Sequence, residues 1–126
     1  MKHLTKFLFV LVVLFLPTMV SAQSGSEAYT EANKISAEAD KKLNAAYNQL
    51  IKSIRADNDK DRAELLVARL QESQRTWLKY RDAQVAFVGI HANVGSASSR
   101  ALGMASYSAE LTEQRIKDLT TVPNPF

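Results

Sequence analysis

The chain has 126 residues, of which 46% are hydrophobic and 23% charged, with three prolines, four glycines and no cysteine. This length accommodates one domain, and the apolar fraction excludes an intrinsically disordered chain. The absence of cysteine excludes disulfides, thiolate metal sites and cysteine nucleophiles. The composition therefore predicts a single domain whose stability comes from packing alone.

The N-terminal segment 1–22 has the pattern of an export signal. Two lysines precede an unbroken apolar run over residues 7–16. Small residues stand at the two positions that a signal peptidase reads, which predicts cleavage between Ala22 and Gln23. Residues 23–126 would then form the exported domain, in the periplasm or outside the cell.

The apolar run is too short to cross a bilayer, which needs roughly 20 residues, so no stable membrane anchor is expected after cleavage. The pI near 9.3 exaggerates the basic character of the domain. Lys2 and Lys6 account for two of the 16 basic residues, which leaves 14 against 13 acidic ones. A nucleic-acid-binding surface usually carries a larger and clustered excess, so no nucleic-acid partner is expected.

Three segments of the domain have apolar residues at spacings of three and four, which is typical of amphipathic helices. Ser26 is expected to cap the first helix, and the Asp57–Asp59 stretch has the composition of a turn before the second. Residues 89–99 contain two glycines and three serines and are predicted to form a loop. The fold class is therefore an all-α, elongated, antiparallel three-helix bundle. The predicted helices span residues of about 26–55, 59–88 and 98–119.

Polar side chains interrupt the apolar stripes of these helices. Gln74 and Arg81 lie on the stripe of the second helix, and Thr112 and Arg115 lie on that of the third. A buried guanidinium without a partner costs several kcal/mol, so each arginine is expected to meet a carboxylate or carbonyl groups. The favoured interpretation is a structural polar layer that fixes the register of the helices. The alternative is a cleft that binds a ligand or a partner.

Folding the chain at its two loops suggests which carboxylates these arginines meet. Gln74 and Arg115 fall at one level, with Asp40 of the first helix nearby, so we predict an ion pair between Asp40 and Arg115, with Gln74 or Asn44 alongside. Arg81 lies nearer the start of the first helix, where Glu31 or Glu38 could pair with it. The complete predicted network consists of Asp40, Asn44, Gln74, Arg81, Asp82, Thr112 and Arg115.

The aromatic residues divide between the expected core and the expected surface. Trp77, the one tryptophan, lies within an apolar stripe and is predicted to be a core residue. Tyr80 and Phe87 point away from that stripe, and with Tyr107 they could form an exposed aromatic patch that marks an interaction surface.

No arrangement of residues that is typical of an enzyme is present. His91 is the one histidine of the domain, and no second ligand stands at metal-binding spacing. The acidic turn at Asp57 lacks the glycine and the final glutamate of a calcium loop, since Arg62 and Ala68 occupy those positions. We therefore expect no catalytic residue, no metal and no cofactor.

Three motifs, one from each predicted helix, together resemble the N-terminal domain family of LprI-type lysozyme inhibitors. They are Asp40-x-x-Leu43-Asn44-x-x-Tyr47, Ser73-Gln74-Arg75-x-Trp77-x-x-Tyr80-Arg81-Asp82 and Leu111-Thr112-x-x-Arg115. This resemblance implies a small exported helical domain that inhibits lysozyme. Many relatives place cysteines where Val85 and Tyr107 stand, so it also implies that these two positions are close together. Apolar packing is then expected in place of the bridge.

The function expected from the residues and the resemblance together is that of an exported, non-enzymatic helical binding module. Its possible target is a lysozyme or another cell-wall hydrolase. The alternative is a structural or envelope-associated interaction protein without a hydrolase target. The predicted loop over residues 89–99, with His91, Asn93 and Ser96, is the expected contact surface, and the oligomeric state stays open.

Overall fold

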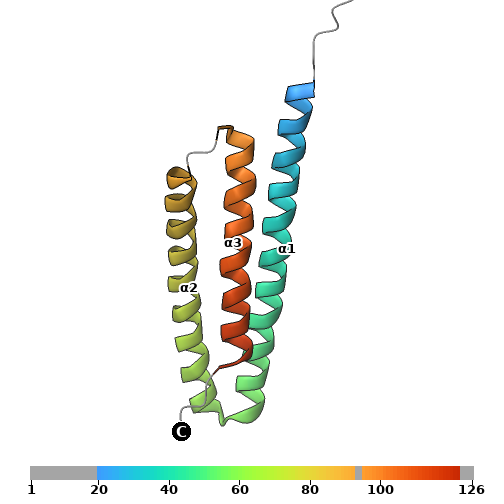
Figure 1. Cartoon of the computed structure of the whole chain (residues 1–126). Coiled ribbons are helices and arrows are strands. Elements are labelled where there is room, and N and C mark those ends of the chain that lie inside the picture. Colours follow the sequence, from blue (N-terminus) through green and yellow to red (C-terminus); the bar gives the residue numbers. More distant parts are fainter. Residues whose placement is uncertain (1–19, 93–94, 123–126) are drawn as a thin grey trace, which may run out of the picture.

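The computed structural model describes residues 20–92 and 95–122, which form three packed α-helices (Figure 1). The helices are α1 (Val20–Asp57), α2 (Lys60–His91) and α3 (Ala97–Thr120), and no strand occurs among the described residues. In Figure 1, α1 and α3 run in one direction and α2 runs in the other. The predicted all-α bundle of three helices is therefore confirmed.

Helix α1 begins at Val20, so the expected start near Ser26 is wrong. Ser26 lies inside the helix, where its carbonyl accepts a hydrogen bond of 3.0 Å from the Thr30 hydroxyl. A side chain on Gly25 would lie 4.0 Å from the Ser98 hydroxyl, so this early turn of α1 packs beside the start of α3. Tertiary packing of this kind extends helices beyond their local start signals. Most of the predicted export signal lies outside the described residues, and its cleavage site stays a prediction.

The turn between α1 and α2 follows the expected chemistry. Asp59 is the N-cap of α2, and its carboxylate accepts a hydrogen bond of 3.0 Å from the backbone N–H of Arg62. The Asn58 side chain donates to the Ile54 carbonyl at 2.8 Å, which satisfies one of the free carbonyls at the end of α1. The two hydrogen bonds cap the adjoining helix ends. The chain therefore reverses within Asn58 and Asp59, and α2 runs antiparallel to α1.

The connection between α2 and α3 is shorter than the predicted loop over 89–99, because α2 continues to His91. Gly89 is buried inside α2, and a Cβ atom there would lie 2.5 Å from Sδ of Met104. The glycine therefore permits a close approach of α3, where the sequence indicated a loop. Ser96 caps α3 by accepting a hydrogen bond of 3.1 Å from the backbone N–H of Ser99.

The two glycines of this region should respond differently to substitution by alanine. Gly103 lies within α3, and a Cβ atom added there would meet open space, so Gly103→Ala should raise the free energy of unfolding by about 0.5–1 kcal/mol. Gly89→Ala should not give this gain, because the new methyl group displaces Met104. Urea denaturation of both variants measures the difference, and an equal gain at the two sites would contradict the close approach.

The most extensive helix contact is between α1 and α3, and the least extensive is between α1 and α2. Small side chains allow this closeness, since Ala32 and Ala39 of α1 and Ala105 of α3 are all buried. Helix α2 is held by longer side chains, several of them polar. The separation of α1 from α2 along most of their length leaves room for the groove described below.

Candidate functional site

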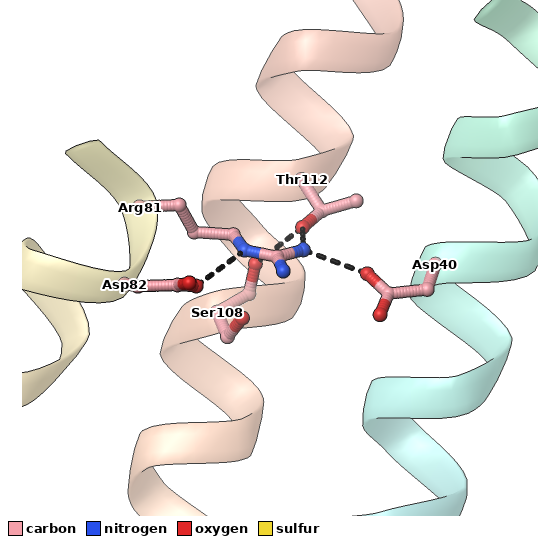
Figure 2. Close-up of polar contacts among 5 residues, drawn as sticks. All are labelled: Asp40, Arg81, Asp82, Ser108 and Thr112. Atoms are coloured by element: carbon pink, nitrogen blue, oxygen red, sulfur yellow. Dashed lines mark hydrogen bonds and ion pairs between the residues drawn. The ribbon is translucent and has the colours of Figure 1, made fainter. Parts of the chain in front are cut away.

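Arg81 extends from α2 across α3 to α1 and contacts all three helices (Figure 2). Its Nη1 donates to Oδ1 of Asp40 on α1 at 2.7 Å and to the Thr112 hydroxyl on α3 at 3.3 Å. Its Nε donates to the exposed Asp82 carboxylate at 3.4 Å. The Arg81 side chain is only 13% exposed, so these hydrogen bonds stabilise a charge that is largely removed from water.

The predicted pairing of Asp40 with Arg115 is wrong, because Asp40 pairs with Arg81. Glu31 and Glu38, the expected partners of Arg81, form no ion pair with it within the described part of the chain. Side chains on a helix lean toward its N-terminus. In the antiparallel α1 and α2, this brings Arg81 and Asp40 toward one another, although their backbones lie at different levels.

Thr112 is the most deeply buried polar residue, with an exposed fraction of 0%. Its hydroxyl donates to the carbonyl of Ser108, one turn earlier in α3, at 2.7 Å. The same oxygen accepts the hydrogen bond from Arg81 (Figure 2). Both hydrogen-bonding functions of the hydroxyl are therefore used, which explains a polar residue at this depth in the bundle.

Arg115 contacts two neutral groups, one of them the side-chain carbonyl oxygen of Gln74, in place of the Asp40 carboxylate. Its Nε donates to Oε1 of Gln74 at 3.0 Å, and its Nη2 donates to the Ser73 hydroxyl at 2.9 Å. Among the residues that the structure describes, Arg115 forms no ion pair. Gln74 was expected beside Arg115 and is confirmed there, whereas Ser73 was missed. Its position directly before Gln74 in the second motif was the available signal.

Trp77 connects the two arginine clusters. The guanidinium carbon of Arg81 lies 5.4 Å from the centre of the indole ring, and that of Arg115 lies 5.9 Å from it. Both distances are within the range of cation–π attraction. The ring is half-buried and so is less enclosed than the core position that the sequence predicted.

A groove with a volume of about 410 Å³ lies between α1 and α2, beside this polar layer. Asn44, which was expected in the network, lines the groove and forms no hydrogen bond within the described segments. Helix α1 contributes Asp40, Leu43, Asn44 and Tyr47 to the lining, and helix α2 contributes Gln71, Gln74, Arg75 and Leu78.

Most of the predicted contact loop, residues 89–99, belongs to the end of α2 and the start of α3. His91 is the last residue of α2, and its ring stacks on Phe87 with the ring centres 5.7 Å apart. Ser96 is engaged as the N-cap of α3, so it is not a free loop side chain. Asn93 lies outside the described residues. Of the two described residues, His91 and Ser96, both are exposed, and only His91 has no capping role.

The expected aromatic patch is only partly present. Tyr80 and Phe87 are exposed, but Tyr107 is half-buried, and its hydroxyl accepts a hydrogen bond of 3.5 Å from Gln84. This polar contact joins α2 and α3 beside Val85, where apolar packing was expected. Ile90, which the sequence did not single out, is 83% exposed and is the most exposed of the large apolar residues described.

The described residues contain no group of three or more His, Cys, Asp or Glu side chains placed to hold a metal ion. None of the described helices combines the length and the apolar character that crossing a membrane requires.

Comparison with known proteins identifies one family. The model of the family described as lysozyme inhibitor LprI matches residues 19–119, a segment that covers all three helices. Searches of curated proteins and of solved structures found no significant match.

Proposed function

The chain belongs to the lysozyme inhibitor LprI family, and from this premise we propose that it is an exported, non-enzymatic helical module that inhibits a lysozyme-type cell-wall hydrolase. The observation that carries this proposal is the family match, which extends over the whole three-helix domain. The export-signal pattern of the first 22 residues supports the location, because such a hydrolase acts outside the cytoplasm.

The exposed apolar residues of α2 supply a surface suited to this task. Tyr80, Phe87 and Ile90 are spaced by seven and three positions, so they lie along one side of the helix, and we call them the α2 ridge. Lysozyme binds its glycan in a cleft, where two carboxyl groups flank the bond that is cleaved. A convex helix with exposed aromatic and aliphatic side chains can enter such a cleft, whereas a groove cannot. His91, stacked on Phe87, adds a polar group at the end of the ridge.

The variant Phe87→Ser with Ile90→Ser should weaken inhibition at least about tenfold, because large apolar side chains at the centre of an interface carry most of its binding energy. Measurement is by titration of the protein into lysozymes and into hydrolases of the native cell wall, with the rate of wall lysis as readout. The matched control is Leu65→Ser, since Leu65 is 59% exposed at the other end of the same helix. It should leave inhibition unchanged.

Equal inhibition by the ridge variant and the original protein would contradict the role of the α2 ridge. No inhibition of any of these hydrolases, together with a stable self-associated species in sedimentation, would overturn the proposed inhibition. That outcome would favour a structural, envelope-associated interaction protein, for which the α2 ridge is then the contact between copies.

A further inference from the structure

The groove between α1 and α2 contains a buried side chain whose hydrogen-bonding capacity is only half used. Gln74 is 9% exposed, and its Oε1 accepts from Nε of Arg115. Arginine can only donate, so this contact fixes the orientation of the amide and turns its NH₂ group the other way. Among the described residues, the Gln74 Nε2 has no hydrogen-bond partner, yet no fully enclosed side-chain nitrogen or oxygen is unpaired. The NH₂ group therefore reaches the groove, which Gln74 lines.

A cation stands beside this oriented donor. Arg75 also lines the groove, is exposed, and forms no ion pair or hydrogen bond within the described part of the chain. The carboxylate of Asp40, which α1 contributes to the lining, is already paired with Arg81 at 2.7 Å. The uncompensated charge of the lining is therefore positive, which favours a ligand with one negative group near Arg75 and an acceptor near Gln74.

The remaining lining combines apolar contact with groups that both donate and accept. Tyr47 and Leu78 are half-buried and provide an apolar surface, and the carboxamides of Asn44 and Gln71 can bind hydroxyl groups in either direction. A sugar ring needs this combination, because it has an apolar face and a rim of hydroxyls. An extended peptide fits less well, since the walls are helices whose backbone groups are already paired and cannot form a ladder with it.

We propose that this groove binds an acidic amino sugar, with the sugar carboxylate on Arg75 and an acceptor oxygen on the Gln74 amide. The choice of this sugar class rests on the proposed function, because the glycan that lysozyme-type hydrolases cleave carries such sugars. The volume of about 410 Å³ is in the range of small-ligand sites and accommodates one or two sugar rings. The α2 ridge would then face the hydrolase while the groove holds the glycan.

The test is an NMR titration of the ¹⁵N-labelled protein with N-acetylmuramic acid and, in parallel, with N-acetylglucosamine, which lacks the carboxylate. We expect the Gln74 side-chain amide signals to shift with both sugars, and the acid to bind about tenfold more tightly. Gln74→Glu identifies these signals by their loss. It keeps an acceptor for Arg115 while replacing the donor by a negative oxygen, so it should fold normally and weaken binding of the acid at least about tenfold.

Arg75→Gln should remove the preference for the acid and leave binding of the neutral sugar unchanged. Arg100→Gln is the matched control, because Arg100 is an exposed arginine on α3 that does not line this groove. The absence of any shift of the Gln74 amide with either sugar would overturn the proposal, as would equal binding of the two sugars by the original protein. These titrations contain no hydrolase. Inhibition of a hydrolase without binding of either sugar would thus contradict only the proposed sugar binding in the groove. Binding of the acid without inhibition would contradict only the proposed inhibition.

Discussion

Arg81→Ala should lower the free energy of unfolding by about 3 kcal/mol, since removal of one member of a mostly buried charged cluster leaves its partners unsatisfied. The variant loses the contacts of Arg81 with Asp40 on α1 and Thr112 on α3, and its contact with the face of the Trp77 ring. The hydroxyl of Thr112 also loses a donor at the most buried polar position. Urea denaturation followed by circular dichroism measures the change.

The matched control for this variant is Asp82→Ala. Asp82 is exposed and contacts the same guanidinium at 3.4 Å, so its loss should cost no more than about 0.5 kcal/mol. A double-mutant cycle between Arg81 and Asp40 then isolates the contact that joins α2 to α1. If Arg81→Ala were no more destabilising than Asp82→Ala, the polar layer would not hold the helices together. A large loss of stability with undiminished inhibition by the folded protein would assign the layer a structural role.

Leu43→Ala should lower the free energy of unfolding by about 3 kcal/mol, which is typical when a fully buried leucine is truncated and leaves a cavity. Leu43 of α1 is 2% exposed and is the most buried of the large aliphatic side chains. Because many of the other buried apolar residues are alanines, this leucine carries an unusually large share of the buried apolar volume. Thermal and urea denaturation both measure the effect.

Leu65→Ala is the matched control for Leu43→Ala, because it removes the same atoms from a side chain that is 59% exposed. Its cost should stay within about 0.5 kcal/mol, as for most substitutions at exposed positions. Similar costs at the two positions would show that α1 is not packed against the rest of the bundle at Leu43.

The helices and the polar residues that interrupt them could be predicted because both depend on spacing along the chain. Apolar periodicity identified three helices, and the residues that broke it included both arginines that bind across the bundle. The turn at Asn58 and Asp59 was equally predictable, since a cap involves residues only three or four positions apart. The family resemblance rested on the same residues, and the family match over residues 19–119 confirms it.

Which residues meet across the bundle could not be derived in this way. Asp40 and Arg81 are 41 positions apart, so a small error in the relative level of two helices exchanged one arginine for the other. The role of Gly89 was also missed, because its meaning depends on Met104 of another helix. The groove follows from the separation of α1 and α2, which results from how all three helices pack.

Local hydrogen bonding and hydrophobic periodicity are properties of short segments, and they were sufficient to establish a three-helix chain with charged residues on its inward faces. The distances between helices result from the sum of many contacts that are distant in sequence. Close packing of small residues draws α3 onto α1, and α2 is held by the long side chains of Arg81 and its neighbours. Only this arrangement decides that the Gln74 amide opens into a groove, because the arginine that orients it lies 41 residues away on another helix.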